Sequence, residues 1–124
     1  MKVLSVNNGK KATYDLSGTN LTVNTPTAGS LTVDLQAGQQ DVRNTVDISL
    51  NNGFTELAEG VGSWYVANII IPAKEVEVYE TGEFGEEGEP VTAVRDLPLD
   101  TNDVVVNLWG LPENSNINNE GGLE

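Results

Sequence analysis

The stretch that decides the fold of this chain is Thr45-Val46-Asp47-Ile48-Ser49-Leu50, in which apolar and polar residues alternate without a break. Successive side chains of a β-strand point to opposite faces, so this alternation predicts a strand with one apolar and one polar face. The segment Leu31–Gln36 repeats the pattern, and shorter versions occur at 14–16 and 21–23. These segments predict a chain built from short strands.

Turn residues separate the predicted strands at regular intervals. Asn7-Asn8-Gly9 and Asn51-Asn52-Gly53 supply residues that tolerate a positive φ angle, as tight hairpins require. Short strands punctuated in this way are typical of β-sandwiches and β-barrels. We therefore predict an all-β fold, an antiparallel sandwich of about eight or nine short strands, with a partly open β-barrel as the alternative.

The middle of the chain departs from simple alternation. In Trp64–Ile71, apolar residues occupy both faces at the end of the segment. This pattern predicts a strand that is buried on both faces or one that leaves the core for a contact surface. Pro72-Ala73 then permits a reversal into Lys74–Tyr79, so we predict a hairpin over residues 63–79.

Two shorter segments complete the predicted elements. The last strand is expected over Asp103–Trp109, with Val104, Val106 and Leu108 facing inward. The single candidate for a helix is Phe54–Glu59, which is followed by Gly60 and spans about one and a half turns.

The predicted domain organisation is simple. Residues 1–112 are expected to form a single all-β domain, and 113–124 a disordered tail whose last two residues, Leu123-Glu124, are typical of a tag remnant. Residues 80–90 contain three Gly and five Glu, which predicts an acidic loop within the domain. We expect this loop to be a mobile excursion of the sheet or a long hairpin loop.

The composition excludes several classes of chemistry. The 124 residues include no Cys and no His, which removes disulfides, zinc sites built on those residues, and the Ser-His-Asp and Cys-His catalytic arrangements. Six Lys plus Arg stand against nineteen Asp plus Glu, a formal net charge of −13. Such a chain repels phosphates, so neither nucleic acid nor an anionic membrane is an expected partner. We recognise no signal peptide or transmembrane segment, and the compartment stays open.

Oxygen-bearing side chains gather shortly before the last predicted strand. The candidate calcium ligands are Asp96, Asp100, Asn102 and Asp103. Calcium binds carboxylate, amide and carbonyl oxygens, although the spacing here is not that of an EF-hand loop. Asp and Asn are also ordinary turn-forming residues, so the same cluster fits a turn.

Aromatic residues suggest a second candidate site. Trp64, Tyr65 and Trp109 could form a platform on which sugar rings stack, or they could anchor the core or a subunit interface. Ile69 and Ile71, on the same strand as Trp64, are further candidates for an interface.

These observations lead to two hypotheses of function. The first is a non-catalytic structural or interaction module, a small subunit that docks on a larger protein assembly such as a phage-like particle or surface structure, or on itself. The alternative is a carbohydrate-binding β-sandwich stabilised by calcium. No pair of carboxylates is identifiable as catalytic, so we do not expect an enzyme, and calcium is the one cofactor considered.

Overall fold

The computed structural model describes residues 1–112, and this part of the chain contains ten β-strands and one short 3₁₀ helix. The predicted tail at 113–124, with Leu123-Glu124, lies outside the described residues. The elements are β1 (Lys2–Ser5), β2 (Thr13–Ser17), β3 (Asn20–Thr25), β4 (Gly29–Asp34), β5 (Asn44–Leu50), β6 (Leu57–Glu59), β7 (Trp64–Ile71), β8 (Val76–Phe84), β9 (Pro90–Asp96), η1 (Thr101–Asp103) and β10 (Val105–Leu108).

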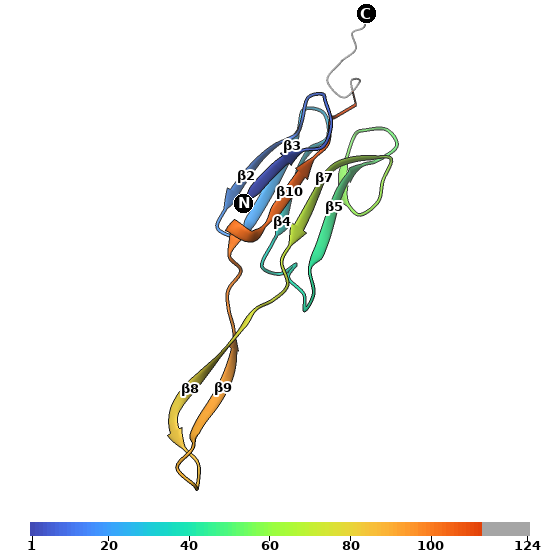
Figure 1. Cartoon of the computed structure of the whole chain (residues 1–124). Coiled ribbons are helices and arrows are strands. Elements are labelled where there is room, and N and C mark those ends of the chain that lie inside the picture. The colour runs from blue at the N-terminus through green and yellow to red at the C-terminus, as the bar shows by residue number, and fades with distance from the viewer. Residues whose placement is uncertain (113–124) are drawn as a thin grey trace, which may run out of the picture.

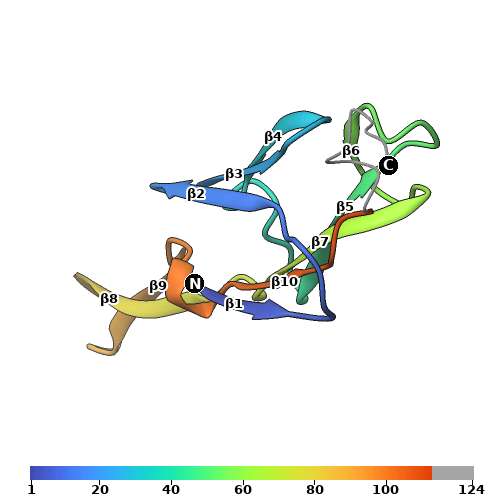
Figure 2. The same ribbon diagram turned by 90° about the horizontal axis from the view of Figure 1, so that it is seen from above.

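Two of the three sheets form a sandwich, which Figure 2 shows from above. One sheet has five strands in the order β1-β10-β7-β5-β6, and the other has three in the order β2-β3-β4. All pairs are antiparallel except β1 with β10. The predicted all-β sandwich is confirmed, and no closed barrel forms within residues 1–112.

The core lies between these two sheets. The alternation in β5 has the predicted effect at Ile48 and Leu50, which are buried, and at Thr45, which is exposed. Ser49 of the predicted polar face is buried as well, and its hydroxyl donates a hydrogen bond to the Gly60 carbonyl at 2.7 Å. Val104, Val106 and Leu108 also point inward, as predicted. Each large apolar side chain buried in this way contributes about 1.5–3 kcal/mol relative to its exposed state. The fully buried residues of largest volume come from both layers: Leu21, Val23, Leu35, Ile48, Leu50, Val66, Ile69, Ile71, Val104 and Val106.

Strand β7 is the centre of the five-stranded sheet. Ile69 is paired with Val46 of β5 on one side and with Val106 of β10 on the other. Both edges of β7 are therefore occupied, and β8 cannot pair with it. The predicted hairpin over residues 63–79 is wrong for this reason.

The predicted helix at Phe54–Glu59 is also wrong. The side-chain oxygen of Asn51 accepts hydrogen bonds from the N–H groups of Thr55 and Glu56, which closes a tight turn. Phe54 has a φ angle of 57°, outside the right-handed helical region. The chain then pairs with β5 as the short strand β6. A local side-chain hydrogen bond has replaced the helical turn.

Strands β8 and β9 form a hairpin that extends away from the sandwich (Figure 1). We call residues 76–96 the arm. The segment at 80–90 does join the two strands of a hairpin, as one of the two expected forms requires, but the loop is shorter than predicted because β8 continues to Phe84 and β9 begins at Pro90. Only residues 85–89 form the turn, which is closed by a hydrogen bond from the Gly85 N–H to the Glu89 carbonyl. The acidic segment is therefore mostly strand.

The position of Ile69 gives a direct test of this packing. Ile69→Ala removes a completely buried side chain and leaves a cavity, so it should lower the free energy of unfolding by about 2–5 kcal/mol. Ile70 is the matched control, because it follows in the same strand but is half-buried on the other face. Ile70→Ala should cost at most about half as much. Urea unfolding of the two variants measures both losses of unfolding free energy, and equal losses would contradict the placement of Ile69 in the core.

Candidate interaction surface

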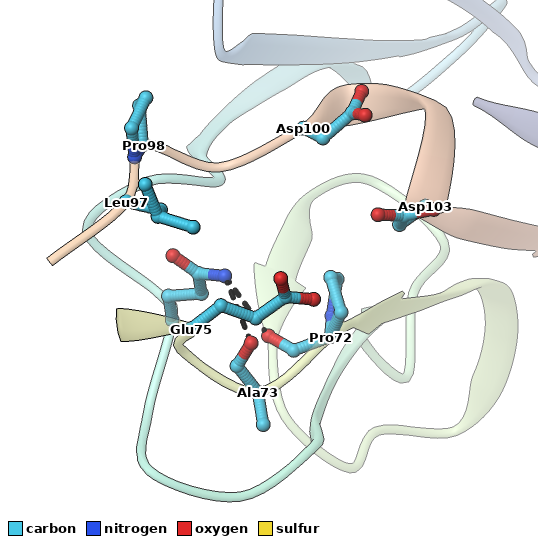
Figure 3. Close-up of a pocket in the computed structure, with 8 residues that line it drawn as sticks. Pro72, Ala73, Glu75, Leu97, Pro98, Asp100 and Asp103 are labelled. Atoms are coloured by element: carbon cyan, nitrogen blue, oxygen red, sulfur yellow. Dashed lines mark hydrogen bonds between the residues drawn. The ribbon is translucent and has the colours of Figure 1, made fainter. Parts of the chain in front are cut away.

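The root of the arm is attached to the sandwich by two glutamines of the turn after β4. Gln39 is 7% exposed, and its amide donates hydrogen bonds to the carbonyls of Pro72 (3.2 Å) and Ala73 (3.3 Å), shown as dashed lines in Figure 3. Gln36 accepts a hydrogen bond from the Leu99 N–H at 2.8 Å and donates to Gln39 at 3.3 Å. The two glutamines thus hold both the segment that enters the arm and the segment that leaves it.

A cavity of about 320 Å³ lies at this root, and Glu75, Asp100 and Asp103 contribute carboxylates to its lining. Glu75 lies at the start of the arm, whereas Asp100 and Asp103 belong to one segment, the 3₁₀ helix η1 and its cap. Within residues 1–112, no three His, Cys, Asp or Glu side chains form a group that could hold a metal ion.

The candidate calcium ligands occupy two different elements. Asp96 is the last residue of β9, paired with Val76, whereas Asn102 and Asp103 belong to the 3₁₀ helix. Asp100 caps that helix, because its carboxylate accepts a hydrogen bond from the Asn102 N–H at 3.0 Å. The geometry of Asp100 fits the turn interpretation of this cluster.

The candidate aromatic platform is divided between two faces. The rings of Tyr65 and Trp109 lie 5.8 Å apart on the outer face of the five-stranded sheet. The Trp109 indole N–H donates to the Asn68 side chain at 2.5 Å, and the Asn68 amide donates to Asp47 at 2.8 Å. Trp64 lies on the opposite side of the strand. The three predicted residues therefore do not form one continuous platform.

Trp64 belongs to a different cluster at one end of the sandwich. Its ring meets Phe54 edge-on at 6.1 Å, and its indole N–H donates to the Gly110 carbonyl at 2.7 Å. Ile69 and Ile71, the other candidate interface residues, are fully buried in the core and line no surface. Apolar character alone could not distinguish the core from an interface in β7.

The two faces of the arm differ in how they are covered. On one face, Arg95 forms an ion pair with Glu77 and lies over the Tyr79 ring, with its guanidinium carbon 4.6 Å from the ring centroid. The opposite face carries Val76, Val78 and Val94, which we call the valine stripe. These side chains are 56%, 65% and 62% exposed. The ion pair and the ring contact are therefore both on the first face.

The valine stripe and the two glutamines are the features that sequence reasoning missed. The Glu-Val alternation at 75–78 correctly indicates a strand, but the predicted hairpin over 63–79 gives it the wrong partner. The strand-forming segment Val91–Arg95, beyond a Gly- and Glu-rich turn, is the signal that points to a separate hairpin.

Charge is concentrated on the arm. Arg95 is the one basic residue in 76–96, against seven acidic residues, so the arm has a net charge of −6. The acidic residues are Glu77, Glu80, Glu83, Glu86, Glu87, Glu89 and Asp96.

Comparison of the chain with protein-family models, curated proteins and solved structures finds no significant match. Among the described residues, no helix has the length and apolar composition needed to cross a membrane.

The role of Gln39 can be tested with Gln39→Leu, which keeps the side-chain size but removes both donated hydrogen bonds. We expect a loss of about 1–3 kcal/mol in unfolding free energy and a more mobile arm. Because the chain has no native Cys, nitroxide labels at Asp15→Cys and Glu86→Cys report the distance from the sandwich to the arm. Pulsed electron spin resonance should show a broader distance distribution.

Gln40→Leu is the control for this experiment. Gln40 is exposed, and within residues 1–112 its contact with the arm root is the backbone hydrogen bond from the Lys74 N–H. The control should therefore leave the distribution unchanged. Identical distributions for Gln39→Leu and the wild-type chain would show that Gln39 does not hold the arm.

Asp100 allows the capping and calcium interpretations to be separated. Asp100→Asn retains a side-chain oxygen for the cap and should preserve stability, whereas Asp100→Ala should lose about 0.5–2 kcal/mol. Thermal unfolding in millimolar calcium and in EDTA measures both effects. A calcium-dependent rise in melting temperature that Asp100→Asn abolishes would contradict a purely capping role.

Proposed function

We propose that this chain is a non-catalytic structural or interaction module that docks on a larger protein assembly through the arm. The observation that carries the proposal is the valine stripe, three exposed apolar side chains on a two-stranded hairpin outside the sandwich. Phe84, close to the tip, is 70% exposed and adds a further apolar group.

The energetics of a two-stranded hairpin support this proposal. Such a hairpin is marginally stable by itself in water, because it has no second layer to cover its apolar face. A partner that covers the valine stripe would supply that layer. Because the three side chains are still more than half exposed, covering them removes further apolar surface from water, which contributes roughly 25 cal/mol per Å².

The backbone of the arm offers a second means of association. Within residues 1–112, β8 and β9 pair only with each other, so each has one unpaired edge. Unpaired edges present N–H and C=O groups to which a partner strand can add. The Gln36–Gln39 pair holds the arm root, which reduces the ordering cost of docking.

The other functions considered have less support from the geometry. A sugar platform would need free hydrogen-bonding groups beside an exposed aromatic face. The Asn68 side chain next to Trp109 is already bonded to both Trp109 and Asp47. The carboxylates of the arm lie on an open hairpin rather than in the enclosed cleft that acid–base catalysis uses.

Site-specific crosslinking in cells of the source organism tests the proposal. A photoreactive benzoylphenylalanine placed at Val78 or Val94 should give an adduct of one discrete mass, identified by mass spectrometry. The same group at Val42 or Val61, which are 67% and 83% exposed on the sandwich, is the control and should not give this adduct.

Excess wild-type chain should compete the arm adduct away. An adduct of twice the 13.2 kDa chain mass would indicate docking on a second copy, which is also consistent with the proposal. No adduct from the arm, or equal adducts from the arm and the control positions, would overturn it.

A further inference from the structure

The chemistry of the arm also indicates the kind of surface that receives it. Resting on the proposed function, we infer that the docking surface belongs to a different, basic protein and consists of an apolar hollow surrounded by Lys or Arg side chains. The valine stripe fills the hollow, and the carboxylates near the tip of the arm pair with the surrounding basic groups.

The valine stripe is a compact patch. Val78 and Val94 are directly opposite in the register of β8 and β9, and Val76 is on the same face as Val78. Glu75 and Leu97 are the next pair after Val76 and Asp96 on the side of the root, and this pair is hydrogen-bonded, because the Leu97 N–H donates to the Glu75 carbonyl. Because hydrogen-bonded and non-hydrogen-bonded pairs alternate along an antiparallel ladder, Val78 and Val94 form a non-hydrogen-bonded pair. Side chains of such pairs lie closest together, so the valines present one continuous apolar surface.

Acidic residues surround this patch. Glu80 lies beyond Val78 on the same face, and Asp96 lies opposite Val76 at the root. Beyond Glu80, the tip adds Glu83, Glu86 and Glu87, all exposed. A hollow that accepts the valines therefore brings its rim close to carboxylates at both ends of the patch.

The arm does not neutralise these carboxylates itself. Its basic residue, Arg95, is already engaged by Glu77 and the Tyr79 ring. Within residues 1–112, this is the one ion pair. The carboxylates of the tip are therefore free to pair with an incoming basic group, and like charges on a partner would be repelled.

Charge also argues against a second copy as the occupant. Two arms meeting through their valine stripes would bring together two surfaces of net charge −6. The rest of the described chain has nine acidic against five basic residues, so the sandwich is negative as well. A separate, basic partner could cover the valines and also pair with the carboxylates of the arm.

A pair of synthetic nine-residue peptides provides the test. One alternates Lys and Val, and the other alternates Glu and Val. The Lys-Val peptide should shift the amide resonances of residues 76–96 of the full chain, whereas the Glu-Val peptide should not. Raising the salt from 0.05 to 1 M reduces the Debye length to roughly 3 Å and should weaken binding about tenfold or more.

Matched variants separate the two parts of the surface. We expect Val78→Ser with Val94→Ser to weaken Lys-Val peptide binding about tenfold, and Val42→Ser with Val61→Ser to have no effect. Replacing Glu80, Glu83, Glu86 and Glu87 by Gln should also weaken it about tenfold. The control replaces four exposed acidic residues of the sandwich by their amides and changes the net charge equally: Asp15, Asp41, Glu56 and Glu59.

Several outcomes would overturn the inference. These are equal binding of the two peptides, equal effects of the arm and sandwich charge variants, and no effect of the valine variants. A crosslinked adduct with a second copy or with an acidic protein would also overturn it, while leaving the proposed docking function intact. Absence of any arm adduct would overturn the proposed function itself, whatever the peptides do.

Discussion

The structure depends on the hydrogen bonding of β7 along both of its edges. β5 and β10 occupy those edges, and the three-stranded sheet packs on the inner face of β7, so that Ile69 and Ile71 are completely buried. The chain that follows β7 has no place in this sheet. It leaves the sandwich at Pro72, forms the arm and returns at Leu97-Pro98, and the Gln36–Gln39 pair holds both crossings. The chain after β7 therefore forms a separate hairpin, because both neighbouring positions in the sheet are occupied by β5 and β10.

Local periodicity predicted much of this fold. The alternation in 45–50 and 31–36 correctly identified strands and their inward residues, because a side chain's face in a strand is set by its own position. It could not show which strands are neighbours, since pairing depends on residues far apart in sequence. The predicted hairpin at 63–79 failed for that reason. The predicted helix at 54–59 failed because one side chain, Asn51, bonds two backbone N–H groups further along the chain.

The candidate site was less predictable than the fold. A buried glutamine such as Gln39 is indistinguishable in sequence from an exposed turn residue, and its partners lie 33 and 34 residues away. The valine stripe looked like the apolar face of a core strand, because alternation is the same whether or not a second sheet covers it. Trp64 and Tyr65 were expected to act together, yet neighbouring residues of a strand point to opposite faces.

The structure places much of the chain's negative charge on the arm, where it affects association. An extended hairpin with exposed valines and two unpaired edges is a hazard for aggregation, since further copies can add to it. The arm's net charge of −6 opposes that association, because each added copy would bring the same charge to the same place. The same charge lowers the free energy of contact with a basic surface. The same glutamates can therefore oppose association of the arm with other copies of the chain and favour its binding to a partner of opposite charge.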